Sequence, residues 1–142
     1  MLFRSEAPTC VSRRILVVDD NEDSAESLAI LLRMHGHLVL TAHDGEAALV
    51  TAEQFQPDAI LLDLGMPKLN GYEVCQRIRQ AAWSTNTLIV AQTGWGQEQD
   101  RARTKAAGFD GHLTKPIDPA MLQDMLSAGR RPAGQRVDPQ SV

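Results

Sequence analysis

The sequence predicts an α/β fold in which a parallel sheet is covered by helices on both faces. Strand-like apolar runs alternate with helix-like amphipathic segments along the chain, which is typical of βαβ units. Residues 59–62 are four consecutive aliphatic residues, and such a run indicates a strand buried on both faces, because a half-exposed strand alternates with polar residues. Further strand patterns occupy residues 14–21, 37–42, 87–94 and 111–116. With the segments between them, they predict five strand–helix pairs.

The chain begins with an expected flexible arm. Residues 1–12 contain polar residues, a proline and no periodicity. Residues 21–34 are predicted to form a helix whose inner face carries Ala25, Leu28, Ala29 and Leu32. Gly36 follows where a glycine commonly caps a helix. The strand over residues 37–42 is expected near an edge of the sheet, since it contains a histidine and a threonine.

Two predicted helices flank the central strand. The second helix starts at residues 44–45 and ends before Pro57, and its expected inner face consists of Ala48, Thr51, Ala52 and Phe55. The third helix begins near residues 70–71 and is expected to bury Val74, Cys75 and Ile78. At this spacing Cys75 is expected to be a core residue rather than a reactive thiol.

The last two predicted helices differ in the strength of their patterns. Residues 97–107 have only Ala102, Ala106 and Ala107 as apolar positions, which indicates either a solvated surface or a weakly anchored helix that shifts between positions. The final helix has Asp118 as its N-cap and Pro119 in its first turn. Its expected inner face consists of Met121, Leu122, Met125 and Leu126. Residues 129–142 have no apolar pattern and are expected to form a flexible tail.

The composition limits the class of protein. A chain of 142 residues is long enough for one domain with a real core. Its net charge of −4 argues against direct nucleic-acid binding, which favours a clustered basic surface. Its two cysteines cannot form a disulfide scaffold, so free thiols in a reducing compartment are expected. No apolar run approaches the roughly 20 residues of a membrane span and no signal-peptide pattern opens the chain, which predicts a cytoplasmic protein.

Polar residues stand where four of the predicted strands end. In a parallel sheet all carboxyl ends lie at one edge, which is where open α/β sheets bind their ligands. We therefore expect one pocket that contains Asp19, Asp20, Asp63, Thr93 and Lys115. Each residue also has a simpler explanation. Asp20 or Asn21 can cap a helix, Thr93 can be a strand-end hydroxyl and Lys115 a solvated charge, but the ordered set favours a functional site.

These motifs resemble the receiver domain of two-component response regulators. The resemblance covers residues 13–128 and rests on residues 15–21, 61–67, 92–94 and 113–117. It implies a flavodoxin-like doubly wound (βα)5 fold whose five-stranded parallel sheet has the order 2-1-3-4-5. Residues 108–116 look most like receivers attached to hybrid sensor kinases, so the chain could be a stand-alone receiver or a piece of a hybrid protein. No second domain or output module is evident, which predicts docking to another protein.

The resemblance also implies a role for each site residue. Asp63 is the implied phosphoacceptor, and Mg²⁺ is held by Asp20, by Asp63, by the backbone carbonyl of Gly65 and, through a water, by Asp19. Thr93 is the implied switch hydroxyl and Lys115 pairs with the phosphoryl group. His112 occupies the position of a second switch residue, while Gly65 and Trp95 occupy positions that tune phosphoryl lifetime. A cis Lys115–Pro116 bond is expected as well.

The chemistry explains why such residues belong together. A carboxylate can accept a phosphoryl group as a covalent intermediate, while Mg²⁺ and a lysine neutralise the charge of an anionic donor. The implied partners are a histidine kinase or histidine phosphotransfer protein as phosphodonor and a downstream protein target.

Two other functions compete with this signalling switch. Mg²⁺ phosphatases also use a strand-end aspartate but typically place a second acid two residues later, where this chain has Gly65. A degenerate receiver that serves only as a binding scaffold is disfavoured, because all five key residues are present.

Overall fold

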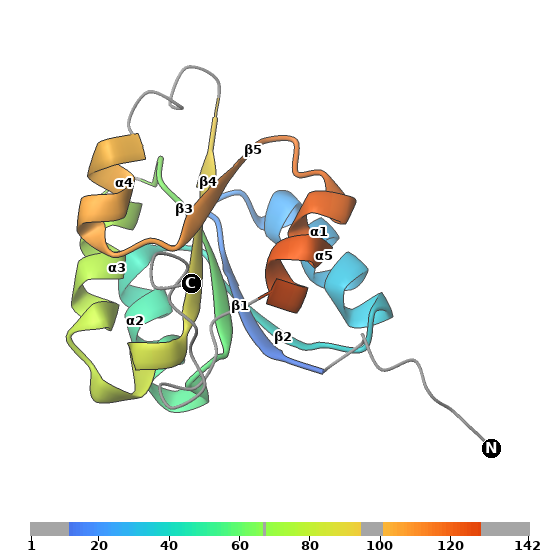
Figure 1. The fold of residues 1–142 in the computed structure, drawn as a ribbon, viewed down its shortest axis with the longest axis horizontal. Coiled ribbons are helices and arrows are strands. Elements are labelled where there is room, and N and C mark those ends of the chain that lie inside the picture. The colour runs from blue at the N-terminus through green and yellow to red at the C-terminus, as the bar shows by residue number, and fades with distance from the viewer. Residues whose placement is uncertain (1–11, 67, 95–100, 129–142) are drawn as a thin grey trace, which may run out of the picture.

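The computed structural model describes residues 12–66, 68–94 and 101–128, and its elements alternate between strand and helix. Their order is β1 (Arg14–Val18), α1 (Glu22–Met34), β2 (Leu38–Ala42), α2 (Gly45–Phe55), β3 (Ala59–Asp63), α3 (Gly71–Arg79), the 3-10 helix η1 (Ala82–Asn86), β4 (Leu88–Thr93), α4 (Arg101–Ala107), β5 (Gly111–Thr114) and α5 (Pro119–Ala128). The strands form a parallel sheet in the order β2-β1-β3-β4-β5. Helices α1 and α5 cover one face of it and α2, α3 and α4 the other (Figure 1). The predicted flavodoxin-like fold is confirmed.

Short polar side chains start the helices, as the sequence pattern requires. Asn21 accepts a hydrogen bond from the Ser24 backbone N–H at 3.0 Å at the start of α1. At the start of α3, Asn70 and Glu73 form a reciprocal capping box. Asp118 accepts from the Ala120 N–H at 2.9 Å, consistent with its predicted capping role in α5. The helix starts are therefore specified locally.

The sheet separates two hydrophobic cores. In β3, Ile60 and Leu62 pack into the core beneath α2 and α3, while Leu61 packs into the core beneath α1 and α5. All five residues of β3 are buried, as its apolar run predicts. Cys75 is also fully buried, and burial raises the pKa of its thiol to about 12, which agrees with a core role.

Some predicted inner faces are wrong in detail. Met121 is 54% exposed, because Leu122 and Leu126 form the buried stripe of α5 and Met121 falls about 100° away from it on the helix. In α4 the exposed residues include Ala102 and Ala106, whereas Thr104 is buried. Thr51 and Phe55 of α2 are only partly buried.

Some sequence-based predictions fall outside the described residues. They are the arm over residues 1–11, the tail over residues 129–142, the helical start over residues 97–100 and the predicted role of Trp95. Among the residues that the structure does describe, none of the helices is long and apolar enough to cross a membrane.

Candidate functional site

Three aspartates meet at the carboxyl edge of the sheet. Asp63 is the last residue of β3, and Asp19 directly follows β1, whose Val18 lies beside Leu62 in the register. Asp20 comes next in the chain and is exposed at the mouth of the site. Each aspartate offers a carboxylate oxygen, and these oxygens lie within 4.8 Å of one another. We call these three residues the acidic cluster.

A lysine from the far end of the chain reaches the acidic cluster. The Lys115 Nζ atom lies 3.0 Å from Asp19 Oδ2 and 3.6 Å from Asp63 Oδ2. Its backbone N–H donates to the Thr93 carbonyl at 2.8 Å, which continues the pairing of β5 with β4. The Lys115–Pro116 peptide bond is cis. The predicted lysine therefore contacts two of the three predicted carboxylates.

Backbone groups fix the two buried carboxylates. Asp19 Oδ1 accepts from the Asn21 N–H at 3.0 Å, and Asp63 Oδ1 accepts from the Gly65 N–H at 3.0 Å. Gly71, at the start of α3, packs directly against the end of β3, and a Cβ at this position would lie 2.6 Å from the Asp63 carbonyl oxygen. Only glycine therefore allows α3 to begin so close to the phosphoacceptor candidate.

Charge is unevenly balanced in the site. Burial raises the pKa of Asp63 above the ordinary carboxyl value; the Gly65 N–H and the Lys115 charge oppose this shift, and Asp19 adds to it. Burial acts to lower the pKa of Lys115, but its hydrogen bond to Asp19 and the charges of Asp63 and Asp19 raise it overall. One ammonium thus faces three carboxylates, which leaves an excess of negative charge.

The remaining predicted site residues lie around this cluster. Thr93 is buried at the end of β4, and its hydroxyl donates to the Leu113 carbonyl at 3.4 Å. His112 is half-buried on β5, beside Ala91 of β4. Gly65 is exposed and contacts Asp63 through its N–H. Trp95 lies outside the described residues.

Two neighbours of the cluster were not singled out from the sequence. His43 Nδ1 lies 3.1 Å from the Asp19 carbonyl oxygen, and only the fold brings these residues together. Gln92 lies beside Asp63 in the register and is 2% exposed. A polar residue between the apolar Leu88–Ala91 segment and Thr93 was the signal that could have drawn attention to it.

A divalent cation of the Mg²⁺ kind fits this donor set. Mg²⁺ prefers oxygen ligands and usually binds through one or two carboxylates while it keeps several waters. The acidic cluster offers carboxylate oxygens only, and its negative charge exceeds that of the single lysine. Its exposed member, Asp20, leaves the site open to solvent.

Comparisons with known proteins agree on one family. The model of the family described as "Response regulator receiver domain" matches residues 15–127. Protein PilH of Pseudomonas aeruginosa is 35% identical over 115 residues, which cover 81% of this chain and 95% of PilH. The DNA-binding dual master transcriptional regulator RpaA of Synechocystis sp. is 38% identical over 117 residues, which cover 82% of this chain but 47% of RpaA. The chain thus spans about half the length of several curated relatives that it matches.

Solved structures give the same result. The receiver domain of sensor histidine kinase PA1611 from Pseudomonas aeruginosa is 33% identical, with a TM-score of 0.75 over 84% of this chain and 98% of that one. That structure has a magnesium ion coordinated in the active site cleft. Chemotaxis protein CheY4 of Vibrio cholerae is 29% identical, with a TM-score of 0.78 over 84% of this chain and 99% of CheY4.

Proposed function

The chain belongs to the response regulator receiver domain family, and from this premise we propose that it is a Mg²⁺-dependent phosphorelay switch whose Asp63 accepts a phosphoryl group. The observation that carries the proposal is that Asp63 belongs to the acidic cluster and also lies beside Lys115, with 3.6 Å between Lys115 Nζ and Asp63 Oδ2. Phosphoryl transfer depends mainly on positioning and on neutralising charge. This arrangement supplies both.

The donor is a phosphohistidine on a histidine kinase or a histidine phosphotransfer protein. An Asp63 carboxylate oxygen attacks phosphorus, the phosphorus–nitrogen bond breaks, and its electron pair returns to the imidazole nitrogen, which takes up a proton. Lys115 is close enough to pair with a phosphoryl oxygen beside Asp63. The transfer gives an acyl phosphate on Asp63.

Mg²⁺ would be held by the carboxylates of Asp20 and Asp63, by the backbone carbonyl of Gly65 and, through a water, by Asp19. When bound, the cation supplies positive charge that offsets repulsion between the carboxylates and the incoming phosphoryl group. Asp19 has a further positioning role that the contacts support, because its Oδ2 atom holds Lys115 at 3.0 Å.

The output of the switch is a change in the α4-β5-α5 surface, which then regulates a partner protein in the cytoplasm. Thr93 is well placed for this change, since its hydroxyl bond to the Leu113 carbonyl is long at 3.4 Å and easily exchanged for one to a phosphoryl oxygen. His112 lies on β5, directly beside β4, and its half-buried ring would follow that movement inward. Gly65 and Trp95 would set how easily water reaches the phosphoryl group.

An enzyme that turns over phosphate esters is the rival function. Such a hydrolase needs a general acid near the nucleophile, and Gly65 occupies the position where aspartate-nucleophile phosphatases typically carry it. We therefore propose a signalling domain that catalyses autodephosphorylation at most.

Labelling by a small phosphodonor tests the proposal. In the presence of Mg²⁺, acetyl phosphate should add one phosphoryl group per chain, as measured by intact mass. Asp63→Asn should abolish the label and keep the fold, because only the nucleophilic oxygen is lost, whereas Asp124→Asn, an exposed aspartate of α5, should leave labelling unchanged. Label that persists in Asp63→Asn would contradict the assignment, and many turnovers without accumulated label would favour the hydrolase.

A further inference from the structure

Two leucines of β2, which lies at an edge of the sheet, are largely exposed (Figure 1). Leu38 is 61% exposed and Leu40 is 43% exposed. Val39 between them packs into the core beneath α1 and α5, so the alternation of a strand turns both leucines toward the side of α2. We call Leu38 and Leu40 the β2 patch. Helix α2 does not cover this patch, because its buried residues are small: Gly45, Ala48 and Ala52.

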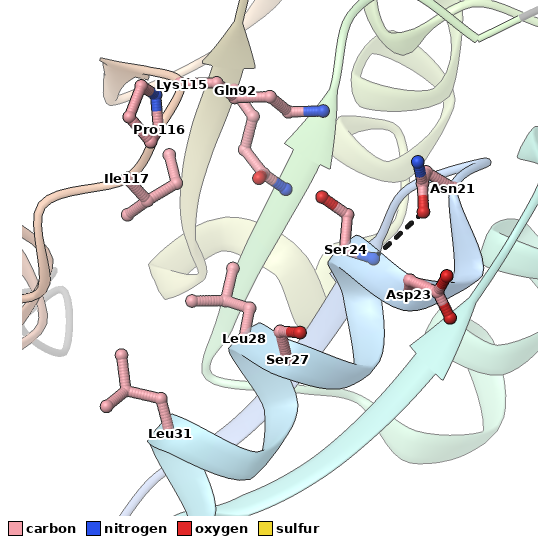
Figure 2. A pocket seen from close by; sticks show the side chains of 10 residues that line it. All are labelled: Asn21, Asp23, Ser24, Ser27, Leu28, Leu31, Gln92, Lys115, Pro116 and Ile117. Carbon is pink, nitrogen blue, oxygen red and sulfur yellow. Dashed lines mark hydrogen bonds between the residues drawn. The ribbon is translucent and has the colours of Figure 1, made fainter.

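The other face of the sheet shows how apolar side chains are covered elsewhere in the fold. There, Leu28 and Leu31 of α1 point toward Ile117, which follows β5 (Figure 2). Leu31 and Ile117 also pack against the core on that face. Among the residues that the structure describes, no element covers the β2 patch in this way. An exposed apolar edge strand tends to associate with whatever chain can cover it.

An arginine of α1 partly blocks the open edge of β2. The Leu38 N–H donates to the Arg13 carbonyl at 2.9 Å, so the backbone of Leu38 faces β1 and that of the next residue, Val39, faces outward. The outward carbonyl of Val39 accepts a hydrogen bond from Arg33 Nη2 at 2.9 Å. A strand from a second copy would have to displace this arginine in order to pair there. This contact favours an occupant that packs on the face of β2 through its side chains.

The first described residues lie beside the β2 patch. The Ser12 hydroxyl donates to the Gly36 carbonyl at 2.9 Å, and the Arg13 N–H donates to His37 Nδ1 at 3.1 Å. Gly36 and His37 directly precede β2. Residues 1–11 are therefore attached to the fold at the amino end of this strand.

The composition and length of residues 1–11 suit this patch. Met1, Leu2 and Phe3 are consecutive apolar residues, and a mostly polar stretch with a proline follows them over residues 4–9. Leu40 lies four residues beyond Gly36 in the sequence, a rise of about 13 Å along a strand. The nine residues from Phe3 to Ser12 can span up to about 30 Å. A segment tethered so closely acts at an effective concentration in the millimolar range, which a second copy in dilute solution does not reach.

We propose that residues 1–3 pack onto the β2 patch of their own chain, with the Phe3 ring against Leu38 and Leu40. Residues 4–9 form the connection to the first strand. The contact removes apolar surface of both partners from water, which is its driving force. The covered strand then offers no apolar surface to a second copy.

Methyl NMR of the whole chain tests this contact directly. Nuclear Overhauser effects are expected between the methyl groups of Leu38 and Leu40 and the ring protons of Phe3, and Phe3→Ser should remove them and shift the methyl signals. A mixture of isotope-labelled and unlabelled chains distinguishes the two possible sources of the ring. Contacts from labelled methyl groups to the ring of an unlabelled chain would identify a second copy as the occupant and overturn the proposal. The absence of any contact with Phe3 would overturn it as well.

Limited proteolysis gives a second, quantitative test. Trypsin cleaves after Arg4, and the docked segment should protect this bond. Leu38→Ser, at an exposed position that leaves the core intact, should speed this cleavage about fivefold, the effect expected from no longer covering the exposed half of a leucine side chain. Met121→Ser, at a similarly exposed methionine of α5 on the other face of the sheet, should not change the rate. Equal rates of cleavage after Arg4 in the two variants, measured by mass spectrometry, would refute the contact.

Discussion

At the scale of single residues, the site depends on how Lys115 is shared between two carboxylates. Its Nζ atom is closer to Asp19 than to Asp63, by the distances of 3.0 and 3.6 Å. Asp19 is 2% exposed, and its other oxygen is bonded to the Asn21 N–H, so it has little freedom to move. Asp19 therefore holds the Lys115 side chain in place. The Asp63 carboxylate makes the longer contact with the lysine.

Lys115→Met should separate phosphorylation from metal binding. Loss of the ammonium removes a charged hydrogen-bond partner of the phosphoryl group, worth about 1.5–3 kcal/mol, so labelling by acetyl phosphate should slow roughly ten- to hundredfold. Mg²⁺ affinity should stay the same or rise, because the competing positive charge is gone. Titration calorimetry and labelling kinetics measure the two effects. Lys105→Met, at an exposed lysine of α4, is the control, and a parallel loss of both properties in Lys115→Met would contradict this division of roles.

His37 should make the fold sensitive to acid. Its ring is buried, and Nδ1 accepts from the Arg13 backbone N–H at 3.1 Å, which requires a neutral imidazole. Burial lowers the pKa of His37, helped by the charges of His35 and Arg13 and opposed by Gln123. The unfolded chain binds this proton near pH ~6.5 and the folded chain only at lower pH. The stability that the folded chain gains by keeping His37 neutral is therefore complete above pH ~6.5. It is lost as the pH falls through the lower pKa that His37 has in the folded chain.

Urea unfolding at several pH values checks this expectation. The free energy of unfolding should fall by at most about 1.4 kcal/mol per pH unit from this single proton. His37→Gln should flatten that part of the profile, whereas His35→Gln, at the exposed neighbouring histidine, should not. Identical slopes in the wild type and His37→Gln would rule out the assignment.

At the scale of elements, Arg79 connects the far ends of several helices and strands. From the end of α3 it donates to the Gly108 carbonyl at 2.9 Å, to the Ser84 carbonyl of η1 at 2.6 Å and to Asp110 Oδ2 at 2.7 Å. The same Asp110 oxygen accepts from the Ile89 N–H of β4 at 2.8 Å. Gly108 has φ +107°, and a Cβ there would lie 2.8 Å from Arg79 Cγ. The turn between α4 and β5 is therefore built around this arginine.

Arg79→Met should destabilise the fold by about 2–3 kcal/mol, because it removes three hydrogen bonds and an ion pair: those from the guanidinium to the Gly108 and Ser84 carbonyls and to the Asp110 carboxylate. Hydrogen exchange should increase around residues 108–112 more than in β1. Arg77→Met, at an exposed arginine of the same helix, should cost less than about 0.5 kcal/mol. If urea unfolding shows an equal loss of unfolding free energy in the two variants, the contacts of Arg79 do not hold the turn between α4 and β5 in place.

The sequence predicted elements better than contacts between them. Apolar runs and caps gave the strands and helix starts, because these depend on neighbours in the chain. The inner faces of α4 and α5 were less predictable: Thr104 is buried while Ala102 and Met121 are exposed. Neither the contacts of Arg79 nor the burial of the Gln92 amide follows from the periodicity of the sequence, since both depend on how distant segments pack together.

At the scale of the whole molecule, the parallel sheet explains why the main site could be anticipated. A sheet with all strands parallel brings every carboxyl end to one edge, so Asp19, Asp63 and Lys115 meet although they lie far apart in the sequence. The strand order came from the family resemblance rather than from composition. The charge of the assembled site then affects the stability of the entire fold.

Mg²⁺ should stabilise the whole molecule, since the acidic cluster exists only when β1 and β3 are paired. At 100 times its Kd, a ligand that binds only the native state adds about 2.7 kcal/mol to the free energy of unfolding, which for a domain of this size raises Tm by roughly 10 °C.

Asp20→Ala should change Tm in opposite directions without and with Mg²⁺. Without Mg²⁺ it removes repulsion among the three carboxylates and raises Tm slightly; with Mg²⁺ it removes a ligand and lowers the gain. Calorimetry with MgCl₂, with NaCl at equal ionic strength, and with Asp23→Ala as an exposed control measures this. If Asp20→Ala keeps the full Mg²⁺-dependent rise in Tm, Asp20 does not bind the cation.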